Sequence, residues 1–225
     1  MSNDPSLVKY DADVARSYES DRRAEAHWKA EQAFVRKYVA KHLLGQVLDL
    51  PVGTGRFFEF YKGADNVIGV DISPHMLEMA SNKAQDIVVP GLELMKADAT
   101  SLPFESDKFD TIFCFRLVHL LPPEVLPRLF AELSRTLKGK LILQLYVPRR
   151  SFVRRVLGAL AVPIFRKMLS ASGNKKQKPW YHIKSYLHEE RLITDLAIEK
   201  GLKLVRRHKL MPYEGSNVLI LEFAK

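Results

Sequence analysis

Apolar runs alternate along this chain with amphipathic stretches, and this alternation predicts strands separated by helices. Five runs are typical of buried strands, at residues 46–51 (QVLDLP), 66–72 (NVIGVDI), 92–97, 109–116 (FDTIFCFR) and 140–147 (KLILQLYV). Ser73 and Pro74 supply a cap and a first helical residue after the second run, and Pro122 opens a helix that extends to Leu137. The pattern indicates βαβ units, and therefore a largely parallel sheet with helices on both faces.

The two ends of the chain depart from this alternation. The first 45 residues are helical in pattern, with Gly45 placed to end the last turn. Towards the other end, a helix at about 185–200 precedes two strands at roughly 202–210 and 216–223. Two strands so close in sequence favour an antiparallel pair at a sheet edge. We therefore expect an α/β fold with a doubly wound, Rossmann-like sheet of seven strands, mostly parallel, with an antiparallel C-terminal edge pair.

Length and composition predict a single domain over residues 1–225. The chain is 47% apolar, which is enough for a full core. One cysteine, Cys114, excludes a disulfide framework and a cysteine-cluster zinc site within one chain, and we expect no metal. The polar N-terminal segment lacks the apolar region of a signal peptide, and the longest uncharged apolar stretch, 156–165, is too short to span a bilayer. These features favour a cytoplasmic protein.

Three successive strand ends carry residues that suit a nucleotide. Ligands of doubly wound sheets bind at the carboxyl ends of the strands. The first strand leads from Asp49 into Gly53-Thr54-Gly55, where glycines let the backbone approach a ligand and free amides favour a carboxylate or phosphate. Asp71 ends the second strand, where a carboxylate can accept both hydroxyls of a ribose. Asp98 and Ala99 follow the third strand, where an acid and a backbone amide can read an adenine edge.

Together these motifs resemble the class I S-adenosylmethionine-dependent methyltransferases, of the small methyltransferase-domain type, over about residues 40–147. The glycine motif of that family is D/E-x-G-x-G-x-G, and here Pro51 replaces the first glycine and removes an amide. The resemblance implies S-adenosylmethionine as cofactor and a helical cover formed by residues 1–45. The cofactor-binding residues that it implies are Asp49, Pro51, Gly53, Gly55, Arg56, Asp71, Ile72, Asp98, Ala99, Phe115 and Arg116.

Two other nucleotide-binding classes fit the sequence less well. A nicotinamide-binding fingerprint requires a third glycine at position 58, where Phe58 stands. No G-K-[ST] phosphate loop occurs, which argues against nucleotide hydrolysis. A non-catalytic scaffold that binds S-adenosylmethionine or nothing, with Pro51 as a sign of decay, stays open as an alternative.

Candidate catalytic residues follow from the chemistry of methyl transfer. An enzyme can promote displacement at a sulfonium by holding acceptor and methyl close and aligned, and a base is needed when the acceptor must lose a proton. His119, beyond the fourth strand, is the natural base at neutral pH. Tyr18 lies in the N-terminal region that covers the cofactor in this family, and Tyr146 ends the fifth strand at the same rim. Packing or surface roles stay open for all three.

The net charge of +9 originates in one segment, residues 148–184, which holds ten basic and no acidic side chains. We interpret it as a basic insertion, in a place where the family varies its acceptor specificity. Three interpretations of this segment compete. It can bind an anionic small-molecule or lipid-linked acceptor at an anionic membrane surface through 151–170. It can instead bind RNA with Trp180 and Tyr181 as stacking platforms, or serve only the solubility of the protein. The apolar stretch 156–165 argues against nucleic acid. We therefore expect a methyltransferase for an anionic or lipid-linked acceptor, peripheral to the inner face of a membrane, with an RNA methyltransferase as the alternative.

Overall fold

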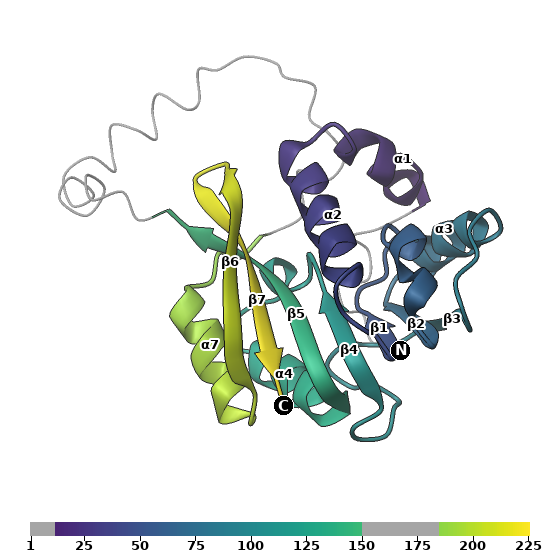
Figure 1. Ribbon diagram of the computed structural model, residues 1–225. Coiled ribbons are helices and arrows are strands. Elements are labelled where there is room, and N and C mark those ends of the chain that lie inside the picture. Colours follow the sequence, from purple (N-terminus) through teal and green to yellow (C-terminus); the bar gives the residue numbers. More distant parts are fainter. Residues whose placement is uncertain (1–11, 150–184) are drawn as a thin grey trace, which may run out of the picture.

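A computed structural model of the protein describes residues 12–149 and 185–225 (Figure 1). Seven strands form one sheet in the order β3-β2-β1-β4-β5-β7-β6. Their bounds are β1 (Gln46–Asp49), β2 (Asn66–Asp71), β3 (Glu93–Lys96), β4 (Phe109–Cys114), β5 (Leu137–Pro148), β6 (Lys203–Tyr213) and β7 (Ser216–Ala224). The first five strands run parallel, and β7 pairs antiparallel with β5 and β6. The predicted fold class is thereby confirmed, and strand order reverses between β1 and β4.

Helices lie on both faces of this sheet (Figure 1). The α-helices are α1 (Ala12–Arg22), α2 (Ala26–Val39), α3 (Pro74–Ala84), α4 (Leu126–Thr136) and α7 (Glu190–Glu199), and the 3-10 helices are η2 (Phe58–Gly63) and η3 (Val118–Leu120). Side chains of α2, η2 and α3 share one apolar core, and those of α4 and α7 share the other. The alternation of β5 separates the two cores, because Leu141 and Leu143 join the α4 and α7 core while Ile142 faces α2.

One predicted feature near the N-terminus needs correction. The segment 1–45 was expected to be helical up to Gly45, but α2 ends at Val39. The chain then turns through bonds such as Lys41 N to Tyr38 O (3.0 Å), and Gly45 takes a positive φ of 60° before β1 begins. Residues 1–11 lie outside the described part of the chain. Within the described part of the chain, the predicted N-terminal cover corresponds to α1 and α2.

The helix expected directly after the glycine turn is a short 3-10 helix, η2, which begins at Phe58. Its entry is set by Gly55, which has a φ of +72° and lies so close to the Phe58 ring that a β-carbon there would overlap the ring. By contrast, the predicted start of the next helix is confirmed, because the Ser73 hydroxyl accepts a bond from the Met76 amide (3.3 Å) and Pro74 occupies the first turn.

Two later helices begin further along the chain than expected. The helix expected from Pro122 begins at Leu126, because Pro122 and Pro123 accept i+3 bonds in the turn before it. The helix expected at 185 begins at Glu190. Residues 150–184 lie outside the described part of the chain, and with them the predicted membrane-binding stretch 151–170 and most of the basic insertion.

Helix α1 is held to the domain by the carboxylate of Glu19. Lys83 of α3 donates to its two oxygens (3.0 and 3.3 Å), and the Thr54 hydroxyl of the glycine turn donates to one of them (3.4 Å). Although partial burial would raise the pKa of Glu19, Lys83 and Arg23 hold it below the ordinary value. The carboxylate therefore remains ionised and links α1 to two elements of the fold.

Helix α2 is held by a more deeply buried carboxylate. Glu31 is 0% exposed and accepts a bond from Arg56 Nη1 (2.7 Å), while Arg116 Nη1 lies 3.8 Å away. Arg56 follows the glycine turn and Arg116 follows β4. The pair therefore fixes α2 over the carboxyl ends of the central strands.

Substituting Glu31→Gln should lower the free energy of unfolding by about 3–5 kcal/mol, because it leaves the buried Arg56 without its countercharge. Urea denaturation followed by circular dichroism measures this change. Asp195→Ala is the control, since it removes an ion pair with Arg191 whose side chains are 88% and 63% exposed, and it should leave the midpoint unchanged. Equal destabilisation by the two substitutions would contradict the role given to Glu31.

Candidate functional site

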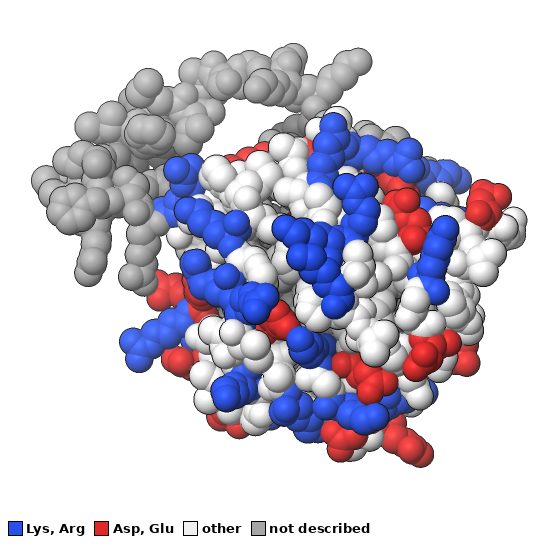
Figure 2. Space-filling view, viewed as in Figure 1, with Lys and Arg blue, Asp and Glu red and all other residues white. Residues whose placement is uncertain are grey.

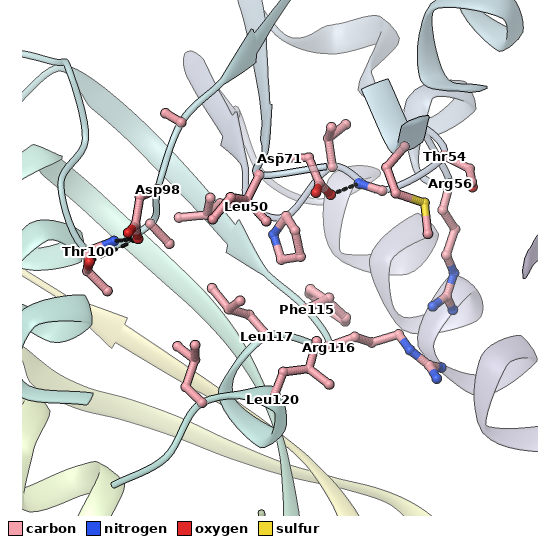
Figure 3. A pocket seen from close by; sticks show the side chains of 18 of the residues that line it. Leu50, Thr54, Arg56, Asp71, Asp98, Thr100, Phe115, Arg116, Leu117 and Leu120 are labelled. Carbon is pink, nitrogen blue, oxygen red and sulfur yellow. Dashed lines mark hydrogen bonds between the residues drawn. The ribbon is translucent and has the colours of Figure 1, made fainter. Parts of the chain in front are cut away.

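A cavity of about 510 Å³ lies at the carboxyl ends of the central strands (Figure 3). The predicted cofactor residues that line it are Pro51, Gly53, Arg56, Asp71, Ile72, Asp98, Ala99, Phe115 and Arg116. Among the predicted catalytic residues, Tyr18 lines the cavity, whereas His119 and Tyr146 do not. Asp49 and Gly55 are also absent from its wall. One cavity thus brings together residues from the three strand ends that the sequence singled out.

Asp71 fixes the glycine turn from the end of β2. One of its carboxylate oxygens accepts a bond from the Gly53 amide (3.0 Å) and the other from the Ser73 amide (2.9 Å), as Figure 3 shows for the first bond. The Gly53 amide is thus bonded within the protein, and the amides expected to be free for a ligand are those beyond the two glycines. Burial raises the pKa of Asp71 to about 6, although both amides favour its charged form. Each oxygen keeps a second lone pair, with which it can accept a hydrogen bond from a hydroxyl group of a ligand.

Pro51 is accommodated in the turn without loss of a needed backbone bond. The amides on either side of it are paired, that of Leu50 with Phe113 O (2.9 Å) and that of Val52 with Val70 O (2.8 Å). The Leu50–Pro51 peptide bond is cis, and Pro51 lies on the cavity wall. Replacing the family's first glycine therefore leaves the turn intact.

Asp98 stands at one end of the cavity, opposite Arg56 (Figure 3). Its Oδ1 accepts bonds from the Thr100 amide (2.8 Å) and the Thr100 hydroxyl (2.9 Å), which orient the carboxylate. Ala99, Leu117 and other apolar side chains complete this end. An oriented acid above an apolar wall suits a flat heterocycle that donates from an amino group.

The opposite end of the cavity is cationic and aromatic. The Arg56 guanidinium lies 3.7 Å from the centroid of the Trp28 ring and donates to Trp28 O (2.6 Å). Among the described residues, Trp28 Nε1 and Arg56 Nε have no hydrogen-bond partner, although both are buried. Unpartnered buried donors beside a cation suit a carboxylate. The residues present therefore fit a molecule with a heterocycle, a ribose and an amino-acid carboxylate in that order.

His119 and Tyr146 lie beyond Arg116, in an aromatic group completed by His27 and Tyr213. The rings of His119 and Tyr146 meet edge to face with centroids 4.9 Å apart. Burial and the charge of Arg116 lower the pKa of His119 well below its ordinary value, and burial raises the pKa of Tyr146. Both side chains are consequently uncharged at neutral pH.

Asp49 lies behind the glycine turn, and its carboxyl is 1% exposed. Burial raises its pKa to about 7, although the neighbouring Tyr61 and Arg56 favour the charged form. Asp49 does not line the cavity and instead contacts the buried Tyr61 of η2.

Sequence reasoning missed Glu31 and assigned Trp28 only to a helix. A signal was present, because Glu31 falls at helical spacing with Trp28, Val35 and Tyr38, so an acid lies on the buried stripe of α2.

In the described part of the chain, no group of three or more His, Cys, Asp and Glu side chains is placed to hold a metal ion.

Residues 47–140 match the family described as a methyltransferase domain. Residues 47–140 are therefore a methyltransferase domain of the class I S-adenosylmethionine-dependent type. One solved methyltransferase, the magnesium protoporphyrin IX methyltransferase of Synechocystis with bound S-adenosylhomocysteine, superposes with a TM-score of 0.68 at 19% identity. That superposition covers 99% of this chain and 100% of the other, so the whole fold is shared.

Curated methyltransferases match part of the chain. Phosphatidylethanolamine N-methyltransferase of Cereibacter sphaeroides is 37% identical over 93 residues, which are 40% of this chain and 44% of that protein. Demethylmenaquinone methyltransferase of Staphylococcus saprophyticus is 34% identical over 123 residues, which are 51% of this chain and 49% of that protein. The chain thus covers no more than about half the length of these two methyltransferases.

The affinity of this methyltransferase for S-adenosylhomocysteine should fall below pH 6, by up to about tenfold per pH unit. We expect ribose hydroxyls to donate to the ionised Asp71, whose folded-state pKa is raised to about 6, so that protonation removes an acceptor as the pH falls through that value. Calorimetric titration between pH 5 and pH 8 measures the dependence.

Two variants distinguish the effect of Asp71 on this pH dependence from that of Asp49, the other buried acid near the glycine turn. Asp71→Asn should bind weakly with no pH dependence in this range. Asp49→Asn should keep the wild-type pH profile, because Asp49 does not line the cavity. A wild-type affinity that stays flat down to pH 5 would show that Asp71 does not contact the cofactor.

Proposed function

We propose that this methyltransferase acts on an anionic small-molecule or lipid-linked acceptor. The observation that carries the proposal is the cationic end of the cavity, where Arg56, Arg116 and Trp28 meet beside the aromatic group. S-adenosylmethionine supplies an activated methyl group when bound. An acceptor that reaches this end of the cavity approaches two guanidinium groups, which favour a negatively charged partner.

In this proposal the chain's own residues orient two molecules. Asp71 accepts the ribose hydroxyls, Asp98 and Ala99 read the adenine edge, and Arg56 with Trp28 holds the carboxylate. Tyr18 lines the cavity and excludes water there, while Tyr146 packs against His119 outside the cavity wall. His119 does not line the cavity, and burial holds its pKa well below the ordinary value, so we assign it no proton transfer.

The charge of the described surface supports contact with an anionic membrane. Figure 2 shows Lys and Arg side chains gathered on the face formed by α2 and β6. Exposed members are Lys29, Arg36, Lys37, Lys41 and Arg206, and none of them has an ion-pair partner in the described part of the chain. Juxtaposed cations attract anionic lipid headgroups. This face thus adds to the basic insertion 148–184 as a membrane-contacting surface.

The names of similar proteins favour the same class of acceptor. Two of them, the phosphatidylethanolamine and demethylmenaquinone methyltransferases, are named for a lipid and a quinone. Within residues 12–149 and 185–225 no helix is long and apolar enough to cross a membrane. We infer a protein of the cytoplasm that meets its acceptor at the inner face of a membrane.

Purified protein should transfer tritiated methyl from S-adenosylmethionine into a total cellular lipid extract, at a level at least about tenfold above that of Asp71→Asn. Total RNA from the same cells is assayed in parallel, because a basic face also attracts nucleic acid. Label in RNA and not in lipid would contradict the proposal. Failure of the wild type to bind S-adenosylhomocysteine would favour the non-catalytic scaffold.

A further inference from the structure

Three buried side chains next to Arg116 carry polar atoms that have no hydrogen-bond partner within the described part of the chain. These atoms are Gln144 Nε2, His27 Nδ1 and Tyr146 Oη. Gln144 is 1% exposed, His27 0% and Tyr146 6%. Buried polar groups in folded proteins are nearly always paired, so three unpartnered ones in one place point to a missing ligand.

The three side chains converge from two elements. Gln144 and Tyr146 are alternate residues of β5, so both project from the sheet face that α2 covers. His27 lies in the first turn of α2, and the centroid of its ring is 6.1 Å from that of the Tyr146 ring. Arg116 joins the set, since its amide and its guanidinium contact Gln144 and His27 respectively.

Each of the three atoms can donate a hydrogen. Gln144 Oε1 accepts from the Arg116 amide (2.8 Å), which identifies the other atom of its side-chain amide as the NH₂ group. Arg116 Nη1 lies 3.0 Å from His27 Nε2, and a guanidinium only donates, so Nε2 accepts and Nδ1 carries the hydrogen. The Tyr146 hydroxyl rotates to suit its partner. A ligand that satisfies all three atoms must therefore present lone pairs.

The charge at this place favours an anion. The guanidinium groups of Arg116 and Arg22 adjoin the donors. Of the two nearby carboxylates, Glu31 is bonded to Arg56, and Glu25 lies 3.3 Å from His27 Nε2 and 3.7 Å from Arg22 Nη1. Tyr213, the last residue of β6, contacts His27 with ring centroids 3.9 Å apart and ring planes tilted by 43°. It remains partly exposed while His27 is buried, so its ring screens His27 from solvent. Hydrogen bonds to an anion are strong where water is excluded.

We infer that Gln144, His27 and Tyr146 form an acceptor subsite that binds an anionic oxygen of the acceptor beside the methionine end of the cavity, with Tyr213 as its cover. The inference rests on the proposed methyl transfer and specifies its acceptor. Two sources of such an oxygen exist, the phosphate of a phospholipid headgroup and the deprotonated hydroxyl of a hydroquinone.

Two variants test the subsite by different chemistry. Tyr146→Phe removes one donor, and Gln144→Glu keeps the acceptor for the Arg116 amide but replaces the donor with an oxygen that repels an anion. Methyl transfer is measured with vesicles of dioleoylphosphatidylethanolamine and, separately, with 1,4-dihydroxynaphthalene. Each variant should lower kcat/KM for the accepted probe by at least about tenfold, chiefly through KM, with unchanged affinity for S-adenosylhomocysteine. The probe that the wild type methylates identifies the source of the oxygen.

Tyr38→Phe is the matched control, because Tyr38 is another buried tyrosine of the α2 face and its hydroxyl neighbours Glu222 rather than Arg116. It lies three helical turns from His27 and should transfer methyl like the wild type. An equal loss of kcat/KM for methyl transfer in all three variants would overturn the subsite. So would an unchanged kcat/KM in Tyr146→Phe and Gln144→Glu. So would a wild type that binds S-adenosylhomocysteine but methylates neither probe. A wild type that does not bind S-adenosylhomocysteine would instead overturn the proposed function.

Discussion

The buried carboxylate of Glu31 organises the cationic end of this methyltransferase. Arg56 and Arg116 come from separate strand ends, and without an acid between them their like charges would repel in a site of low dielectric. Glu31 supplies that acid from α2 at 2.7 Å and 3.8 Å. Breaking a buried pair is strongly unfavourable because one charge is left uncompensated. The position of α2, and with it the cover of the cavity, therefore depends on this interaction.

The same interaction determines which donors face the ligands. The bond from Arg56 Nη1 to Glu31 holds the Arg56 guanidinium over the Trp28 ring. Nε of Arg56 takes no part in this bond and has no hydrogen-bond partner among the described residues. Arg116 contacts His27 with its guanidinium and Gln144 with its amide, at a positive φ of 61°. Such a φ is uncommon for a residue with a β-carbon and marks a backbone held by its surroundings. One side of Arg116 thus lines the cavity, and the other supports the donors of the aromatic group.

The parts of the site that lie on single strand ends could be predicted from the sequence. Asp71, Asp98 and the glycine turn follow strands whose carboxyl ends meet at one edge of a parallel sheet, so local pattern and topology suffice to bring them together. The cavity wall includes all three. Their chemical roles remain predictions.

The contacts across the cover could not be predicted in this way. Glu31 and Arg56 are far apart in sequence, and their meeting depends on how α2 packs across the sheet. Gln144 lies within an apolar run of β5, and its function depends on which face α2 covers. Asp49, though at a strand end, does not line the cavity, and the motif alone could not show this. Long-range packing decided each of these outcomes.

Hydrogen–deuterium exchange in wild type and Glu31→Gln, each with and without S-adenosylhomocysteine, tests most directly whether Glu31 couples the cover to the cofactor turn. In the wild type, ligand should protect the amides of both α2 and residues 50–57. In Glu31→Gln, protection of both segments should fall together, because the charge that joins them is gone. Faster exchange in α2 with unchanged protection of residues 50–57 would contradict the account.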